Sequence, residues 1–200
     1  MSDQKKALRT ELLWRRDSLP AASIQLWNRL IQERTVSLEL YRASPAVALY
    51  SPTGSEVDTT RIRDHAFQLG KSVYYPRWSK AGHLELIRIE SPAQLQPGAY
   101  GILEPMSGAS LRHEERKNLL AIVPGVAFDL RGNRLGRGKG MYDRLLAQLG
   151  DIAGSVAVAY EAQIVEQIPV QSWDRKMDCI ITEERIIDCQ NGSLRLHLGS

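Results

Sequence analysis

The sequence predicts an α/β fold built around a mainly parallel β-sheet flanked by helices. Short apolar runs typical of buried strands alternate with segments in which apolar residues recur every three or four positions, as they do on one face of a helix. The chain has 200 residues, a length that suits one domain. A chain of this size buries roughly 70% of its unfolded surface. We therefore expect a single domain over residues 1–200 that needs neither disulfides nor a metal to fold.

The composition is that of an ordinary water-soluble protein. Apolar residues make up 43% of the chain and charged residues 24%, and the net charge of +3 is too small to indicate a nucleic-acid partner. Two cysteines, Cys179 and Cys189, are too few for a disulfide framework and indicate a reducing compartment. The N-terminal segment has no signal-peptide core, and no run reaches the about 18 apolar residues of a membrane span. We expect a cytoplasmic monomer that binds small molecules and neither membranes nor nucleic acids.

The first half of the chain predicts helix, helix, strand and helix in turn. Leucine spacing places two helices in the first forty residues, separated at the segment SLPAAS, where a proline begins the second. A short apolar run bounded by prolines predicts a buried strand at 46–51. The next helix lies within 57–70, with Asp58 or Thr59 as N-cap and Gly70 at its end.

Further strands are expected in the remaining chain. The run at 71–76 predicts a strand, and the alternation of polar and apolar residues at 83–89 predicts a half-exposed strand at a sheet edge. Additional buried strands are expected at 119–124, 155–160 and 178–182. Residues 91–110 are rich in proline and glycine without a period, which indicates either a functional loop or elements that the pattern does not reveal.

The segment RLGRGKGMYD, residues 134–143, is a candidate phosphate-binding loop. It follows an apolar run and precedes a predicted helix at 142–150, so it has the strand–loop–helix context of such loops. It matches neither Walker A, because Gly140 follows Lys139, nor the Rossmann spacing G-x-G-x-x-G. Backbone N–H groups at alternate glycines and at a helix N-terminus nevertheless bind anions well.

The charged residues of this loop suit nucleotide chemistry. Arg134, Arg137 and Lys139 would supply positive charge to phosphates, and Asp143 could face a magnesium ion held by the same phosphates. The alternative is a solvent-exposed basic turn in which Asp143 serves only the helix N-terminus.

Five further residues are candidates, and most of them have a structural alternative. Lys5 and Arg9 lie four residues apart on one helix face, which is also the pattern of a solvated basic stripe. Glu56 precedes a helix and would either serve its N-terminus or accept hydrogen bonds from the amino group of a heterocycle. Trp78, in YYPRW, offers an aromatic ring for stacking. Asp178 opens a predicted strand and is either a magnesium ligand or a loop residue.

The segment VPGVAFDLRGNRLGRGKGMYDRLL resembles the signature of the 5-formyltetrahydrofolate cyclo-ligases, also called methenyltetrahydrofolate synthetases. The segments KKALR, SEVDT, YYPRW, GILEP and WDRKMDCIIT extend the resemblance, in order, over nearly the whole chain. The resemblance implies a Rossmann-like three-layer α/β sandwich. It also implies ATP- and Mg²⁺-dependent cyclisation of 5-formyltetrahydrofolate to 5,10-methenyltetrahydrofolate, with release of ADP and phosphate. The mechanism it implies is attack of the formyl oxygen on the γ-phosphate, followed by ring closure when N10 attacks the resulting N5-iminium phosphate.

The resemblance also assigns roles to residues of this chain. It implies ATP contacts by Lys5, Lys6, Arg9, Arg134, Leu135, Gly136, Arg137, Gly138, Lys139, Gly140, Met141 and Tyr142, among which Arg137 and Lys139 are the expected catalytic residues. It implies folate contacts by Arg9, Ser51, Glu56, Trp78 and Tyr142, and magnesium ligation by Asp143 and Asp178. Two positions depart from the commonest family pattern: arginine stands at 137 where many members have tyrosine, and Met141 replaces a tyrosine and cannot donate a hydrogen bond.

Two other functions stay open on the sequence. One is a folate-independent paralogue that uses the same nucleotide loop on a different small substrate. The other is a non-catalytic protein that binds folate or nucleotide without releasing ADP. The predicted magnesium pair, Asp143 and Asp178, argues against the second, because a binding protein has little need for a metal that bridges phosphates.

Overall fold

The computed structural model describes residues 3–79, 82–98, 101–190 and 194–195. In this part of the chain an eight-stranded sheet has the strand order β13-β12-β11-β9-β6-β1-β2-β3. Its strands are β1 (Ala46–Ala48), β2 (Ser72–Trp78), β3 (Leu84–Ile89), β6 (Leu119–Val123), β9 (Gly154–Val158), β11 (Cys179–Ile181), β12 (Ile186–Asp188) and β13 (Leu194–Arg195). The longer helices are α1 (Asp3–Asp17), α2 (Ala21–Ser37), α4 (Thr60–Gln68) and α5 (Met141–Leu149), and α3 (Glu39–Ala43) is a single short turn.

The centre of this sheet is parallel, as the sequence predicts. β1 pairs parallel with β2 on one side and with β6 on the other, and β9 pairs parallel with β6 and β11. Only the outer strands run antiparallel: β3 beside β2, and β12 and β13 beyond β11. The sequential order reverses at β1, because the chain places β2 on one side of it and β6 on the other. Such a switch point opens a crevice beyond the carboxyl ends of the strands.

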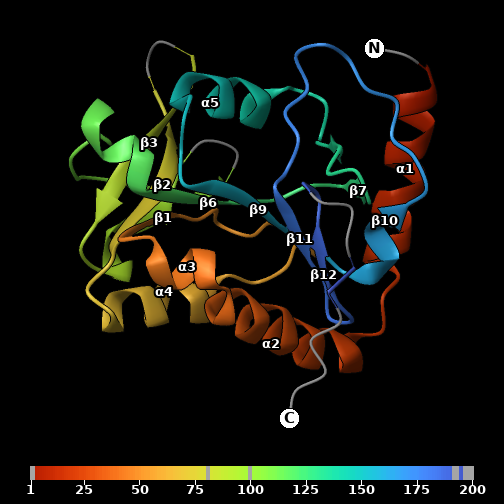
Figure 1. Ribbon diagram of the computed structural model, residues 1–200, viewed down its shortest axis with the longest axis horizontal. Helices are drawn as coiled ribbons and strands as arrows, with labels where there is room; N and C mark the ends of the chain where they lie inside the picture. The colour runs from red at the N-terminus through yellow and green to blue at the C-terminus, as the bar shows by residue number, and fades with distance from the viewer. Residues whose placement is uncertain (1–2, 80–81, 99–100, 191–193, 196–200) are drawn as a thin grey trace.

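Helices cover both faces of the sheet, which confirms the three-layer α/β fold (Figure 1). α2, α3 and α4 lie below the sheet in this view and α5 lies above it. Alternate residues of each strand point to the two sides, so Val47 and Leu49 pack toward α2 and α4, whereas Ala46 and Ala48 pack toward α5.

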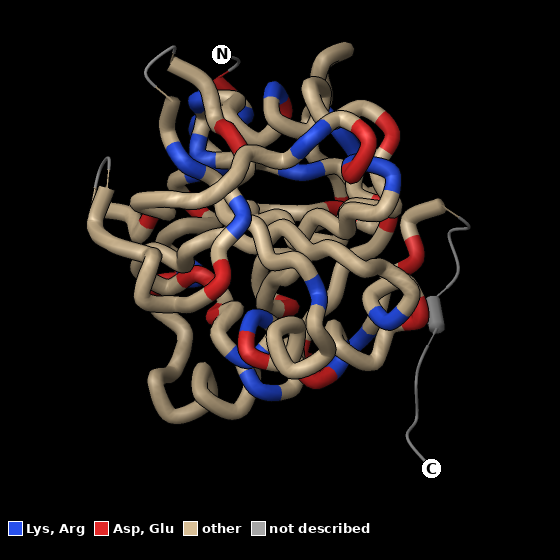
Figure 2. Tube along the Cα trace, turned by 90° about the vertical axis from the view of Figure 1, so that its left-hand side faces the viewer, with Lys and Arg blue, Asp and Glu red and all other residues tan. Residues whose placement is uncertain are grey.

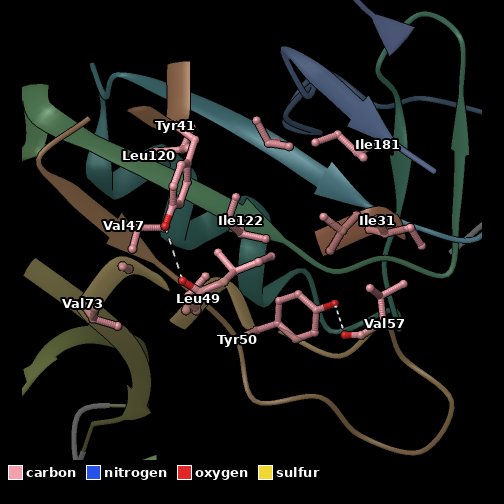
Figure 3. Packing of buried hydrophobic residues seen from close by; sticks show 14 of the residues in the cluster. Ile31, Tyr41, Val47, Leu49, Tyr50, Val57, Val73, Leu120, Ile122 and Ile181 are labelled. Carbon is pink, nitrogen blue, oxygen red and sulfur yellow. Dashed lines mark hydrogen bonds between the residues drawn. The ribbon is translucent and has the colours of Figure 1, made fainter. Parts of the chain in front are cut away.

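The larger core cluster lies on the α2–α4 side and combines aliphatic and tyrosine side chains (Figure 3). Ile31 of α2 and Tyr41 of α3 are both 0% exposed there. Burying tyrosine requires a partner for its hydroxyl, and Tyr50 donates to the carbonyl oxygen of Val57 at 2.7 Å. This bond ties the end of β1 to the segment that precedes α4.

A second, smaller sheet lies beside the main one and was not predicted. It consists of β10 (Ile164–Val165), β7 (Ala127–Asp129) and β8 (Arg134–Leu135), which are too short to give a sequence pattern. α1 packs on this sheet through a third apolar cluster that includes Leu12, Ala127 and Leu135. Helix α1 therefore stands to one side of the three layers (Figure 1) and next to the chain that enters the glycine-rich loop.

The predicted elements are present, with shifted ends. β3 lies at a sheet edge, as its alternating sequence predicts. α4 begins one residue after Thr59, and the side chain that accepts a hydrogen bond at its start is that of Asp58, whose Oδ1 lies 3.1 Å from the Thr60 nitrogen. Gly70, at φ +68°, ends this helix.

The segment 91–110 is more regular than its composition indicates. It contains a 3₁₀ turn at Pro92–Gln94 and a two-stranded hairpin of β4 (Leu95–Pro97) and β5 (Leu103–Pro105). Of the two alternatives that the composition left open, the structure shows elements that the pattern does not reveal, because strands of three residues show no periodicity. The 3₁₀ helix His113–Asn118 then leads into β6. Within the described residues, no helix is both long enough and apolar enough to span a bilayer.

The turn between β7 and β8 is fixed by Gly132, which supplies a testable prediction. Gly132 has φ +81°, and a Cβ atom there would lie 2.4 Å from the carbonyl oxygen of Met177. We expect Gly132→Ala to lower the free energy of unfolding by about 3 kcal/mol, from the left-handed conformation and the clash together.

The matched control is Gly70→Ala, because Gly70 also has positive φ but no atom lies within 4 Å of the added Cβ. This variant should lower the free energy of unfolding, measured by urea denaturation, by only about 1 kcal/mol. Equal losses would show that the contact with Met177 is unimportant.

Candidate active site

A pocket of about 330 Å³ lies at the switch point of the sheet, beyond the carboxyl ends of β1, β2 and β6. The loop that connects β8 to α5 closes one side of it, and the β4–β5 hairpin contributes to another. Its lining residues are Tyr50, Ser51, Thr53, Glu56, Pro76, Trp78, Leu84, Ile102, Glu104, Pro124, Gly125, Arg134, Gly136, Arg137, Lys139, Gly140, Met141, Tyr142 and Asp143. The pocket therefore combines a cationic glycine loop with carboxylates and an aromatic and aliphatic wall.

The glycine loop has the backbone conformation that its sequence suggests. Gly138 has φ +102°, and Gly140, at φ +60°, is the residue immediately before α5. Both conformations are left-handed and favour glycine. Because α5 begins at Met141 against the pocket, the unpaired N–H groups and the positive end of its dipole are available to an anion there.

Arg134 is a buried cation at the base of this loop. It is 6% exposed, and its Nη2 donates to Asp143 Oδ1 at 2.9 Å while Nη1 donates to the Pro124 carbonyl oxygen at 3.3 Å. Its guanidinium carbon lies 5.7 Å from the centre of the Tyr142 ring. Among the described residues, no group accepts a hydrogen bond from its buried Nε. Arg134 is thus held in the pocket wall with donor capacity left over.

Arg137 and Glu56 form an ion pair that joins two loops across the pocket. Nε and Nη2 of Arg137 lie 3.1 Å and 2.9 Å from Glu56 Oε1, and Nη2 also donates to Thr53 Oγ1 at 2.7 Å. The other oxygen of Glu56 accepts from the backbone nitrogen of Thr53 at 3.0 Å. The side chain of Glu56 is 9% exposed, whereas that of Arg137 is 55% exposed. The arginine is therefore the half of the pair that solvent and ligands reach.

The N-terminal helix α1 contacts the glycine loop through Arg9. Arg9 Nε donates to the carbonyl oxygen of Gly136 at 2.9 Å, so the structure brings Arg9 to the loop. Lys5 and Lys6 do not line the pocket. Lys5 is 6% exposed and forms an ion pair with Asp174 at 2.6 Å, whereas Lys6 is exposed. A uniformly solvated stripe is thus the wrong description of this helix face.

Two hydrogen bonds, each between a side chain and a backbone atom, hold the β4–β5 hairpin at the apolar wall. Ser51 Oγ donates to the carbonyl oxygen of Leu103 at 2.6 Å, and the Trp78 backbone nitrogen donates to Glu104 Oε2 at 3.0 Å. Ser51 and Trp78, both predicted site residues, therefore line the pocket and also support its edge. Tyr142 lines the pocket as well, and burial raises the pKa of its hydroxyl, which stays protonated at neutral pH.

The two predicted magnesium ligands have different surroundings. Asp143 lines the pocket in the first turn of α5, and both of its hydrogen bonds to described residues, from Arg134 and from the Arg175 nitrogen, go to Oδ1. Asp178 is absent from the lining. Its Oδ2 accepts from the nitrogen and hydroxyl of Ser155 at 2.7 Å and 2.9 Å, and its Oδ1 accepts from Gln190. The described part of the chain contains no group of three or more His, Cys, Asp or Glu residues that could hold a metal.

Two predicted loop residues lie outside the pocket lining, and several lining residues were not predicted from the sequence. Leu135 is buried in the α1 cluster, and Gly138 lies at the exposed tip of the loop. Thr53, Ile102 and Glu104 line the pocket without having been predicted. Glu104 lies in GILEP, one of the segments that carry the family resemblance, so the sequence did single out this segment. Only the β4–β5 hairpin brings it to the carboxyl ends of the strands.

Lys and Arg positions gather at the end of the molecule where α1 begins, with acidic residues among them (Figure 2). The pocket lining itself combines the cations Arg134, Arg137 and Lys139 with the carboxylates Glu56, Glu104 and Asp143. Specific cations with neighbouring carboxylates suit a compact phosphate ligand better than an extended polyanion.

Comparison with known proteins shows which proteins this chain resembles. Residues 1–183 match the 5-formyltetrahydrofolate cyclo-ligase family. The chain is 31% identical over 195 residues to the 5-formyltetrahydrofolate cyclo-ligase of Mus musculus, with 92% of this chain and 96% of that protein covered.

Solved structures of similar proteins have the same fold as this chain. The NMR structure of Aquifex aeolicus 5,10-methenyltetrahydrofolate synthetase superposes with a TM-score of 0.82 at 36% identity and covers 97% of each chain. A Mycoplasma pneumoniae 5,10-methenyltetrahydrofolate synthetase superposes with a TM-score of 0.73 at 24% identity, over 92% of this chain and 100% of that one, and shows the shared fold.

Proposed function

The chain belongs to the 5-formyltetrahydrofolate cyclo-ligase family, and we propose that its pocket binds ATP and 5-formyltetrahydrofolate together and converts the folate to 5,10-methenyltetrahydrofolate. The observation that carries this proposal is the presence, in one pocket, of a glycine loop at a helix N-terminus and of a wall that suits a heterocycle. The match over 183 residues and the close structural likeness do not favour a folate-independent paralogue. A non-catalytic binder is disfavoured on the same ground.

The glycine loop would hold the triphosphate. The backbone N–H groups of the first turn of α5 offer hydrogen bonds to phosphate oxygens, and Arg134 and Lys139 offer charge. Arg134 is already fixed by Asp143 and Pro124, so it loses little freedom when a phosphate binds. Leu135, Gly136 and Gly138 shape the loop, and Arg9 fixes it through the Gly136 carbonyl group. Lys5 and Lys6 remain predicted ATP contacts that this pocket does not include.

The reaction needs positioning more than a protein nucleophile. The formyl oxygen attacks the γ-phosphorus and the bond to ADP breaks, which leaves the former formyl carbon bonded to an oxygen that carries phosphate. N10 then attacks this carbon, the carbon–oxygen bond breaks as phosphate departs, and N10 gives up its proton. Charge develops on phosphate oxygens in both steps, so the catalytic contribution of Arg137 and Lys139 is electrostatic.

The opposite side of the pocket would hold the folate. Trp78 offers an aromatic surface, Ile102 and Pro76 continue the apolar wall, and Glu56 offers a carboxylate to the N–H donors of the heterocycle. Met141 lines the same pocket and contributes apolar contact in place of the usual tyrosine.

Asp143 would hold a magnesium ion, and the described residues offer it no group of three or more protein ligands. Magnesium commonly uses one or two carboxylates together with phosphate oxygens and water, and it neutralises charge on the phosphates it bridges. Asp143 stands beside the phosphate loop and satisfies the first requirement. Asp178 remains a predicted second ligand, and its bonds to Ser155 and Gln190 would have to be exchanged or shared.

The proposed function is tested directly by the product. Incubation with 5-formyltetrahydrofolate, ATP and Mg²⁺ should produce the absorbance of methenyltetrahydrofolate together with one ADP for each folate. Omission of any of the three should abolish the signal. Absence of product at high protein concentration, in a sample that binds both ligands, would favour the non-catalytic alternative.

Replacement of the loop lysine should separate nucleotide use from folding. Lys139 is exposed, so Lys139→Ala should leave the thermal unfolding midpoint unchanged while lowering kcat/KM for ATP by about 100-fold or more, which corresponds to about 2.7 kcal/mol of lost charge stabilisation. Lys117→Ala, at an exposed lysine of the 3₁₀ helix outside the pocket, is the control. Normal turnover by the Lys139 variant would contradict the loop assignment.

The magnesium positions are tested by titration of the metal. Asp143→Asn should raise the Mg²⁺ concentration needed for half-maximal activity by about tenfold, because a neutral amide is a weaker ligand for a hard cation. Asp178→Asn should do the same if Asp178 is a ligand. A metal requirement unchanged from the parent protein would remove that residue from the site.

A further inference from the structure

Arg16, at the end of α1, is a buried cation to which neither the sequence nor the proposed reaction gives a role. It is 3% exposed, whereas its neighbour Arg15 is exposed. Placing a charge in a protein interior is unfavourable unless hydrogen bonds and opposite charges compensate for the lost water. The partners of Arg16 therefore show what this charge stabilises.

These partners belong to two loops that form the pocket. Arg16 Nε donates to Ser55 Oγ at 2.9 Å, and Nη1 lies 3.4 Å from the carbonyl oxygen of Gly125. Ser55 immediately precedes Glu56 in the loop that follows β1, and its hydroxyl donates in turn to Asp17 Oδ1. Gly125 follows β6 and lines the pocket. One guanidinium group thus links the loops that follow two neighbouring parallel strands.

The electrostatic surroundings of Arg16 point to Glu56. Burial lowers the pKa of Arg16, and among the nearby charges Glu56 has the largest opposing effect, while Arg137 acts in the same direction as burial. Glu56 consequently has a cation on each side. Arg137 binds it directly from the exposed loop, and Arg16 stands behind it, outside the pocket lining.

Arg137 and Arg16 differ in their freedom to move when a nucleotide binds. Arg137 is half-exposed and belongs to the phosphate loop, so a triphosphate competes with Glu56 for its guanidinium group. Arg16 is enclosed by α1 and the two loops and cannot follow. Loss of Arg137 would leave Glu56 with its hydrogen bonds from Thr53 and with the charge of Arg16.

We propose that Arg16 is a positioning residue that fixes Ser55 and Glu56 from behind, so that Glu56 stays in place to receive the folate when Arg137 turns to the phosphates of ATP. The inference rests on the proposed function of the pocket. It adds that the folate side depends on a residue of α1 that touches neither substrate, and that the nucleotide side depends on it much less.

The test compares ligand affinities rather than activity alone. Binding of 5-formyltetrahydrofolate to Arg16→Met, measured by calorimetry with a non-hydrolysable ATP analogue and Mg²⁺ present, should be weakened by about tenfold, which corresponds to about 1.4 kcal/mol. Affinity for the analogue should change by about twofold or less, or about 0.4 kcal/mol. Arg16→Lys should recover part of the folate affinity because it restores the charge but not the two-point geometry. Arg15→Met is the matched control at the adjacent exposed position and should bind folate as the parent does.

Specific outcomes would overturn the inference. Parent-like folate binding by Arg16→Met would do so, as would equal losses of folate and nucleotide affinity, which indicate a general structural role. Should Arg16→Met fail to fold by circular dichroism, Arg16→Lys decides. It should raise KM for folate by about threefold, or about 0.7 kcal/mol, with kcat retained, and an unchanged KM would refute the proposal. A parent protein that binds both ligands but forms no product refutes the proposed function alone, because the affinity comparison remains valid.

Discussion

Parallel pairing of β1 with strands on both of its sides is the constraint on which the rest of the site depends. Because β2 and β6 both run parallel to β1, the loops that leave all three strands emerge at the same edge of the sheet. The chain turns in opposite directions after β1 and around β6, so the loops diverge and a crevice remains between them. Every group that the pocket uses, from Glu56 to Trp78 and Asp143, reaches it from this edge or from the hairpin beside it.

Positive charge in the crevice is arranged by paired interactions before any ligand binds. Arg134 is fixed by Asp143, Arg137 by Glu56, and the backbone of the loop by Arg9. The two ion pairs, Arg134–Asp143 and Arg137–Glu56, reduce the repulsion between cations brought close together. The pairing with Asp143 also holds the Arg134 guanidinium group in the pocket wall before a phosphate arrives, which is how electrostatic catalysis limits reorganisation during the reaction. The carboxylates of the pocket therefore stabilise the unliganded site as well as serving the proposed ligands.

Helix α1 extends this arrangement beyond the three layers. It does not cover the main sheet but packs on the small β7–β8–β10 sheet, and its polar residues reach the glycine loop through Arg9 and the β1–α4 loop through Arg16. These two arginines are seven residues apart, two helical turns, and so lie on one face. That spacing was visible in the sequence, but a charged residue on a helix face is ordinarily solvated, and only packing against two loops shows that Arg16 is buried.

The sequence by itself determined the α/β class, the edge position of β3 and the glycine loop at the start of α5, because each depends on local periodicity, on glycine conformation or on a contiguous motif. Tertiary structure decided the rest. The pairing of Arg137 with Glu56 joins residues 81 positions apart, and the hydrogen bonds between Asp178 and Ser155 follow from the order of β9 and β11. Glu104 reaches the pocket only through a hairpin whose strands are too short to leave a pattern. Local sequence encodes which conformations each segment prefers, whereas contacts between distant segments depend on strand order, which no local pattern contains.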